Sequence, residues 1–143
     1  MTKPRFLKWF IAITLSIILL DQILKQLILR TQPEWHSPLL TIHLITNTGA
    51  GFGILQNQTW ILTILSFIVA CTLIWLYKDA PKEWSIQILL ALFLGGVIGN
   101  LIDRAMRGFV IDFIDFGWWP AFNLADASIT IAVMGMIFYY WKK

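Results

Sequence analysis

The sequence predicts an all-α membrane protein in which four transmembrane helices carry a small β-sheet on the outer membrane surface. Three observations lead to this fold class. The chain of 143 residues is 58% hydrophobic and only 13% charged, whereas soluble domains have about 25% charged residues. Four apolar runs are each long enough to cross a hydrocarbon core about 30 Å thick. Basic residues gather near one set of helix ends, as they do in multi-pass proteins.

The apolar runs set the boundaries of the spans. We expect the spans at 9–29, 60–77, 85–102 and 122–141, within a single integral membrane domain that covers 1–143. The first run follows three basic residues, as in a secretory signal peptide, but no small-residue cleavage site comes after it. We therefore expect it to be kept as the first helix.

The distribution of basic residues predicts the orientation. Seven of the eleven lysines and arginines lie near the two chain ends or in the short loop 78–83. The positive-inside rule puts these segments in the cytoplasm, so the longer connections 30–59 and 103–121 lie outside. Because topology explains the basic residues, we expect no nucleic-acid partner.

The first outer connection contains the signals of a small sheet. Residues 40–44 alternate apolar and polar side chains, which is typical of a short strand. The following stretch, 47–53, has glycines at alternate positions and favours a tight backbone. A small sheet on the outer surface is therefore expected.

Polar and ionisable residues within the spans gather at one depth. An ionisable side chain at the centre of a membrane helix costs about 2.5–3.5 kcal/mol, so each one needs an explanation. Two of the helices carry an Asn and an Asp three positions apart, and we expect each such pair on one helix face. The set consists of Asp21 and Lys25 in the first helix, Asn100 and Asp103 at the end of the third, and Asn123 and Asp126 at the start of the fourth.

Asp112 and Asp126 are the strongest candidates for catalysis. Apolar neighbours surround both, and no cation lies within four residues of either in the sequence. Two carboxylates that lie close together share one proton, so their apparent pKa values separate. One can then activate a water while the other protonates or polarises a carbonyl.

Other chemistries lack the residues they need. Cys71 is the single cysteine and sits in an apolar stretch, which is typical of a packing residue rather than a nucleophile. No His-Glu-x-x-His zinc motif occurs in the sequence. We expect no metal ligands and no cofactor.

Several of the polar residues also have structural interpretations. Asp21 and Lys25 are four positions apart and suit an internal ion pair that lowers the cost of burial. For Asp103 and Arg104 we favour a structural pair at the helix end over direct chemistry. Asp115 precedes a predicted turn, and we expect it to be a solvated loop acid.

Two other function classes are compatible with four spans. A small ion or proton translocator also uses intramembrane acids. It needs titratable groups along the full depth of the bilayer, however, and the inner halves of these helices have almost none. A structural partner protein would use Gly95 and Gly99, which form a small-xxx-small face for close helix packing. That role does not explain why Asp112 and Asp126 are present.

Five motifs spread over most of the chain resemble those of one family, the bacterial lipoprotein signal peptidases, also called signal peptidase II. Each motif is weak alone, but together and in the family order they are highly specific. They are DQILK at 21–25, NTGAGF at 47–52, GGVIGNLIDR at 95–104, VIDF at 110–113 and PAFNLAD at 120–126.

The resemblance implies a fold and a reaction. Members of that family have four spanning helices and a small sheet cradle on the outer membrane surface, and they are intramembrane aspartic endopeptidases. By resemblance, Asp112 and Asp126 form the catalytic dyad. The resemblance also implies supporting or substrate-binding roles for Asn47, Asn100, Asp103, Arg104 and Asn123, and for Asp21 and Lys25 in holding the first helix. In the implied mechanism, Asn123 and Asn47 are candidates for stabilising the tetrahedral intermediate.

The implied substrate is a prolipoprotein whose signal peptide ends at a diacylglyceryl-modified cysteine, with cleavage just before that cysteine. The implied location is the bacterial cytoplasmic (inner) membrane, with both termini in the cytoplasm and the active site at the outer face. The expected partners are lipid-modified signal peptides and membrane lipids, and we expect a monomer. Geometry agrees, because a signal peptide spans from inside to outside and brings its scissile bond to the outer face.

Two features depart from the family pattern. Gly51 stands where the family more often has a second alanine. The connection from Asp112 to Asn123 is shorter than is usual for the family. If this connection acts as a lid, its length bears on substrate range and turnover.

Overall fold

The computed structural model describes residues 4–142 of the chain. Within them, four long helices are apolar enough to cross a membrane. These are α1 (Pro4–Thr31), α2 (Thr59–Leu76), α3 (Trp84–Arg107) and α4 (Leu124–Trp141). A three-stranded antiparallel sheet contains β1 (Trp35–His36), β2 (Thr41–Asn47) and β3 (Val110–Asp115), in that order. Two 3-10 helices, η1 (Gly51–Gly53) and η2 (Tyr77–Asp79), lie in the connections. The predicted fold class, four apolar helices with a small sheet, is confirmed.

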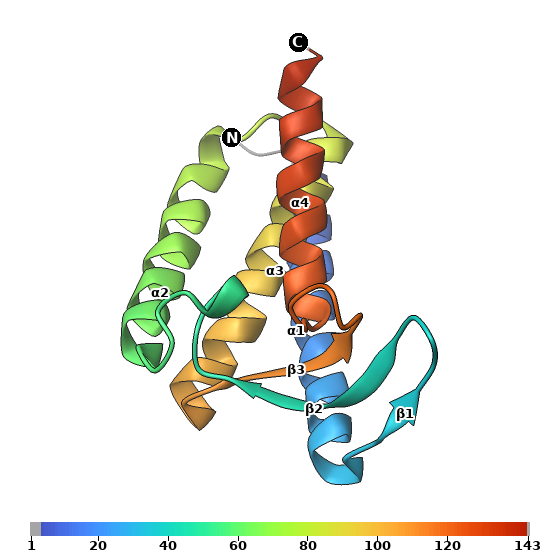
Figure 1. Cartoon of the computed structure of the whole chain (residues 1–143). Helices are drawn as coiled ribbons and strands as arrows, with labels where there is room; N and C mark the ends of the chain where they lie inside the picture. The colour runs from blue at the N-terminus through green and yellow to red at the C-terminus, as the bar shows by residue number, and fades with distance from the viewer. Residues whose placement is uncertain (1–3, 143) are drawn as a thin grey trace.

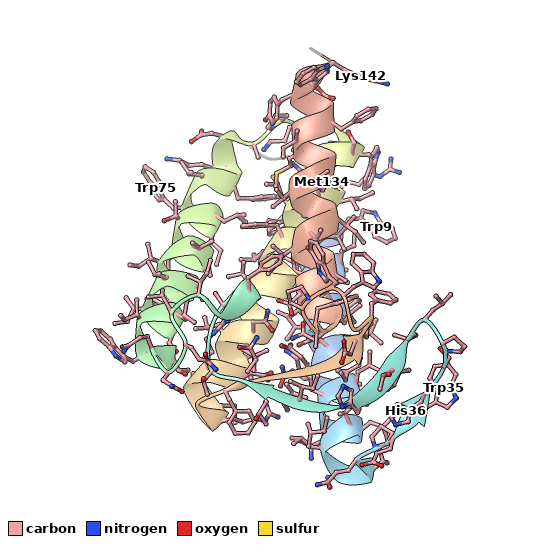
Figure 2. The ribbon with its side chains drawn as sticks, in the orientation of Figure 1. Trp9, Trp35, His36, Trp75, Met134 and Lys142 are labelled. Carbon is pink, nitrogen blue, oxygen red and sulfur yellow. The ribbon has the colours of Figure 1, made fainter. Side chains whose placement is uncertain are left out.

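The sheet lies across one end of the helix bundle, and the beginning of α1 and the end of α4 lie together at the other end (Figure 1). The helices therefore run alternately toward and away from the sheet. Strand β1 and the turn that follows it project sideways beside the end of α1, carrying Trp35 and His36 (Figure 2). All three strands of the described chain belong to one end of the molecule.

Helix α3 is central, because it packs against α1, α2 and α4. Among the long helices of residues 4–142, α3 is the single packing partner of α2. It buries only Leu62 and Ala70, and Trp75 points away from the bundle (Figure 2). A helix that is apolar on all sides is typical of one surrounded by lipid.

Glycines let the neighbouring helices approach α3 closely. A Cβ added at Gly95 would lie 2.8 Å from the Cβ of Ile17, and one added at Gly99 would lie 2.7 Å from Oδ2 of Asp21. Gly96 makes the corresponding contact with the backbone of Ala125 on α4. The predicted use of small residues for close helix packing is confirmed.

Helix α3 continues beyond its predicted end at Ile102. It runs to Arg107 and stops at Gly108, whose φ of 79° is left-handed and favours glycine. Asp103 and Arg104 therefore lie inside the helix and not in the outer connection. The apolar run ends at Ile102, but charged side chains do not end a helix when other groups of the protein neutralise them.

The sheet is larger than the sequence predicted. Strand β2 covers residues 41–44 of the expected strand 40–44 and extends to Asn47, where it pairs with Val110 of β3. Strand β3 was not predicted as a strand, because Val110–Phe113 are all buried and show no polar alternation. Ile111 and Phe113 pack with Ile28 of α1 beneath the sheet, so β3 is held against the helix bundle.

Candidate active site

The start of α4 is fixed by a reciprocal capping box. The Oδ1 atom of Asn123 accepts a hydrogen bond from the backbone N–H of Asp126 at 2.9 Å, and Oδ2 of Asp126 accepts from the backbone N–H of Asn123 at 3.3 Å. Asn123 is thus the cap that precedes α4. The expectation that the two residues share a helix face is wrong, because a capping box uses the same spacing of three.

Asp112 of β3 is buried beside this cap. Its Oδ1 accepts from Nδ2 of Asn123 at 2.8 Å, and its Oδ2 accepts from Nδ2 of Asn47 at 3.0 Å. The side chain is 1% exposed. Burial, together with the negative charge of Asp126, raises the pKa of Asp112 from 3.8 to about 7. Asp112 therefore holds a proton at neutral pH more readily than an ordinary aspartate does.

Asn100 of α3 connects Asp126 with α1. Its Nδ2 donates to Oδ1 of Asp126 at 2.7 Å. Its Oδ1 accepts from Nζ of Lys25 at 2.9 Å and from Nδ2 of Asn123 at 3.1 Å. Since Lys25 has only donors, it fixes which end of the Asn100 amide faces Asp126.

Asn123 forms hydrogen bonds with both candidate acids, and its side-chain N–H groups are not free to bind a substrate. Its Nδ2 is directed at three acceptors, namely Oδ1 of Asp112, Oδ1 of Asn100 and the backbone oxygen of Ile111. Asn123 is fully buried. The expectation that it donates to a reaction intermediate is not supported, because its N–H groups already have partners.

A buried ion cluster lies behind these amides. Nζ of Lys25 is 2.8 Å from Oδ2 of Asp21 and 3.0 Å from Oδ2 of Asp103, and all three side chains are fully buried. Arg107 contacts Oδ1 of Asp103 at 2.6 Å. The predicted Asp21–Lys25 ion pair is confirmed. The predicted pair of Asp103 with Arg104 is wrong, since Asp103 faces α1 and pairs with Lys25 and Arg107.

Two further contacts tie this cluster to the site. Oδ1 of Asp21 accepts from the backbone N–H of Ala125, the residue before Asp126, at 2.9 Å. Oδ2 of Asp103 accepts from the backbone N–H of Ile111, the residue before Asp112, at 3.1 Å. A buried carboxylate therefore fixes the backbone of the residue that precedes each candidate acid.

Arg104 lies close enough to Asp112 and Asp126 to interact with their charges. Its Nη2 donates to the backbone oxygen of Gly49 at 3.4 Å. Its buried Nε has no hydrogen-bond partner among the described residues. A buried donor without a partner is unfavourable, and Arg104 also lines the groove described next.

A groove of about 620 Å³ is lined in part by Asp126, one of the two candidate acids. Its polar side chains include Asn47, Arg104 and Asp126, and most of its surface is apolar. The groove extends to Ile131, which is 59% exposed on the outside of α4. A second hollow of about 290 Å³ includes Asp112. The two hollows share lining residues, which are Asn47, Ala50, Phe52, Pro120 and Ala121.

Asp115 is less isolated than the sequence suggested. It ends β3 instead of lying in a loop, its side chain is 27% exposed, and it contacts His43 at 3.1 Å. A hydrogen bond from the backbone N–H of Gly117, and then the contact with His43, lower the pKa of Asp115. The turn predicted after Asp115 is present, with Gly117 at a φ of 76°.

Sequence reasoning missed two polar residues of the ion cluster. The Nε2 atom of Gln22 donates to Oδ1 of Asp103 at 3.1 Å, and its Oε1 accepts from Arg107 at 3.3 Å. The spacing of four between Asp103 and Arg107 could have predicted the ion pair of these two residues, but it was not used. Among residues 4–142, no three His, Cys, Asp or Glu side chains gather in a way that would hold a metal ion.

Comparisons with known proteins agree with this arrangement. Residues 13–142 match the family described as signal peptidase (SPase) II. A lipoprotein signal peptidase of Halothermothrix orenii is 35% identical, and the alignment covers 92% of this chain and 94% of that protein. One from Moorella thermoacetica is 39% identical, with 93% and 91% covered.

Solved structures show the same fold. Two bacterial membrane enzymes, determined by the in meso method, superpose with TM-scores of 0.88 and 0.87, each at 32% sequence identity. The first comparison covers 94% of this chain and 88% of that structure, and the second covers 100% and 99%. Because the family match covers nearly the whole chain and the relatives match along nearly their whole length, this protein belongs to the signal peptidase II family of membrane peptidases.

Proposed function

We propose that this protein removes signal peptides from diacylglyceryl-modified prolipoproteins by cleaving just before the lipidated cysteine. Family membership supports the substrate class, because the relatives above are lipoprotein signal peptidases. The apolar groove lined by Asp126, together with the neighbouring hollow lined by Asp112, also supports it. Such a groove suits a substrate that carries both a lipid and a membrane-spanning peptide.

Asp112 and Asp126 act as the catalytic dyad in this proposal. The observation that carries it is that Asn123 binds both, through its side chain to Asp112 and through its backbone N–H to Asp126. The negative charge of Asp126 contributes to the raised pKa of Asp112. Two carboxylates that influence each other and have different surroundings are suited to divide the roles of acid and base.

We assign the proton to Asp112 and the base role to Asp126. Asp126 takes a proton from a water molecule, the water oxygen bonds to the scissile carbonyl carbon, and Asp112 gives its proton to the carbonyl oxygen. The carbon–nitrogen bond then breaks as the proton on Asp126 passes to the leaving nitrogen. A hydroxyl proton of the intermediate returns to Asp112, which restores the dyad.

Arg104 and Asn47 are the proposed substrate contacts. Arg104 lines the groove and its buried Nε–H has no partner among the described residues, so in this proposal its guanidinium group donates to a backbone carbonyl of the bound peptide. Asn47 uses one N–H on Asp112 and has a second one to donate. We propose a positioning role for Asn100 and Asn123, and a structural role for Asp21, Lys25 and Asp103.

We propose that the site faces the outside of the cell and that both termini are cytoplasmic. The end of the bundle far from the sheet carries a set of basic residues, as the positive-inside rule requires of a cytoplasmic face. Single-cysteine labelling in a Cys71→Ala background tests this orientation. A cysteine at position 56 or 108 should react with an impermeant reagent from outside, and one at position 82 should not. The reverse pattern would exclude the proposed mechanism.

Cleavage of a purified prolipoprotein tests the function. The substrate should be compared in detergent with and without the diacylglyceryl group on its cysteine, and only the modified form should be cleaved. Asp112→Asn and Asp126→Asn keep size but remove acid–base function, so each should lower the rate at least roughly a hundredfold. Asp79→Asn is the matched control, because Asp79 is exposed at the far end of the bundle.

The outcome is interpretable only if all variants reach the membrane at similar levels. Equal cleavage of the unmodified substrate would exclude the proposed substrate class. Full activity of Asp112→Asn would exclude the proposed dyad. Loss of wild-type cleavage with a chelator and its return with zinc would indicate a metallopeptidase instead.

A further inference from the structure

Segment 116–122 connects β3 to α4 and forms one wall of the groove. Its base is closed by hydrogen bonds in both directions between Ile114 and Phe122, each of 3.0 Å. The segment is therefore a short loop with a fixed base. The members that line the groove are Phe116, Trp118, Trp119, Pro120, Ala121 and Phe122.

The tip of this loop contacts the opposite wall. Trp119 packs edge-on against Phe52 of η1, with 5.2 Å between ring centroids. Trp118 lies between Phe116 and Trp119 in a row of aromatic contacts. Because Phe52 and Trp119 both line the groove, the position of the loop determines how far the two walls are apart.

A pair of residues outside the groove fixes the direction in which the loop leaves the sheet. Oδ1 of Asp115 accepts from the backbone N–H of Gly117 at 2.7 Å. Oδ2 of Asp115 contacts Nε2 of His43 on β2 at 3.1 Å. Asp115 therefore links the turn at Gly117 to the neighbouring strand. Neither His43 nor Asp115 lines the groove.

We propose that His43 and Asp115 are positioning residues that hold segment 116–122 in place as the wall against which the lipid-modified region of the substrate binds. This inference rests on the proposed function, because it assigns the groove to that substrate. The pair acts through the loop and not on the reacting atoms. Its loss should therefore weaken substrate binding and leave the chemical step nearly unchanged.

The side chains allow a matched set of variants. Asp115→Ala removes both contacts, whereas Asp115→Asn keeps an oxygen that accepts from Gly117. His43→Ala removes the partner, whereas His43→Gln places an amide nitrogen near the position of Nε2. His36→Ala is the control, since His36 lies in the same sheet but is exposed on β1, where its ring contacts Thr41. Partly exposed ion pairs contribute little to global stability, so these variants should fold.

Two measurements on the full-length protein test the proposal. Amide hydrogen exchange of segment 116–122 in detergent needs no substrate, so it tests the loop even if the proposed function fails. Steady-state cleavage of a diacylglyceryl-modified prolipoprotein separates kcat from KM. If the wild type does not cleave this substrate, the proposed function fails while the exchange result still stands.

We expect Asp115→Ala and His43→Ala to raise exchange in 116–122 and to raise KM about tenfold, with kcat changed less than about twofold. Asp115→Asn and His43→Gln should restore most of the wild-type exchange and most of the wild-type KM. His36→Ala should match the wild type in both. Unchanged exchange in the segment would overturn the proposal. So would a loss of kcat at constant KM, or faster exchange along the whole chain, because either result would show a role other than holding this wall.

Discussion

The ammonium group of Lys25 lies 2.9 Å from the side-chain oxygen of Asn100, and this contact turns the amide nitrogen of Asn100 toward Asp126. Lys25 also separates the buried carboxylates of Asp21 and Asp103. One cation on α1 therefore both pairs with two buried carboxylates and orients a hydrogen-bond donor of the candidate site.

Lys25→Met should strongly destabilise the protein, because it leaves two buried carboxylates without their shared cation. Removal of one partner of a buried ion pair costs about 3–5 kcal/mol. Thermal unfolding in detergent measures the effect. Lys8→Met is the control, since Lys8 is exposed and such changes alter stability by about 0.5 kcal/mol or less. Equal unfolding temperatures for the two variants would contradict the role of Lys25.

Asn123→Ser and Asn123→Ala should separate helix capping from the positioning of the dyad. Serine is a good N-cap and alanine is a poor one, so the serine variant should be about 1 kcal/mol more stable than the alanine variant. Both lose the N–H groups that hold Asp112, so both should lower cleavage at least roughly tenfold. Unfolding and cleavage should be measured on the same samples. Wild-type cleavage by the serine variant would mean that capping alone matters.

The raised pKa of Asp112 predicts that stability changes with pH. In the unfolded chain Asp112 loses its proton near 3.8, and in the folded protein it keeps the proton up to about 7. The stabilisation from this group is therefore complete below about pH 4 and is lost as the pH rises to about 7, with a slope of up to about 1.4 kcal/mol per pH unit. Asp112→Asn should remove this part of the pH dependence of unfolding.

The same group predicts how cleavage responds to pH. If protonated Asp112 is the acid, the rate should fall as the pH rises through about 7. A rate that rises steadily through this range would assign the proton to another group.

Two glycines should respond oppositely to replacement by alanine. A Cβ at Gly99 would lie 2.7 Å from Oδ2 of Asp21 and 3.2 Å from the Cβ of Ala125, so Gly99→Ala must displace the ion cluster or α4. We expect a loss of about 1–3 kcal/mol. No atom lies within 4 Å of a Cβ at Gly51, so Gly51→Ala should be neutral or slightly stabilising. Denaturation of both variants in parallel tests the contrast.

The sequence predicted the helices well because hydropathy alone identifies spans. It also singled out Asp112 and Asp126, because apolar neighbours surround each of them. The structure brings both into contact with Asn123. The common depth of the two acids was therefore sufficient to predict that they lie together.

The features that the sequence did not predict depend on contacts between helices and strands. The Asn-x-x-Asp spacing at 123–126 fits a helix face as well as a cap, and only the backbone angles of Asn123 distinguish them. Strand β3 has no alternation because both of its faces are buried. The pairing of Asp103 with Lys25, rather than with Arg104, depends on how α3 is rotated relative to α1. Sequence spacing indicates faces within a helix but not rotation between helices.

The ion cluster also bears on how the chain enters the bilayer. Asp21 and Lys25 are four positions apart on α1, and Asp103 and Arg107 are four apart on α3. Each helix thus carries its own opposite charges one turn apart, which lowers the energy of inserting it as a separate segment. The contact between Lys25 and Asp103 joins two segments and forms only when the inserted helices associate. Membrane insertion and tertiary assembly of this protein are therefore separable stages, and the second stage completes the surroundings of the candidate acids.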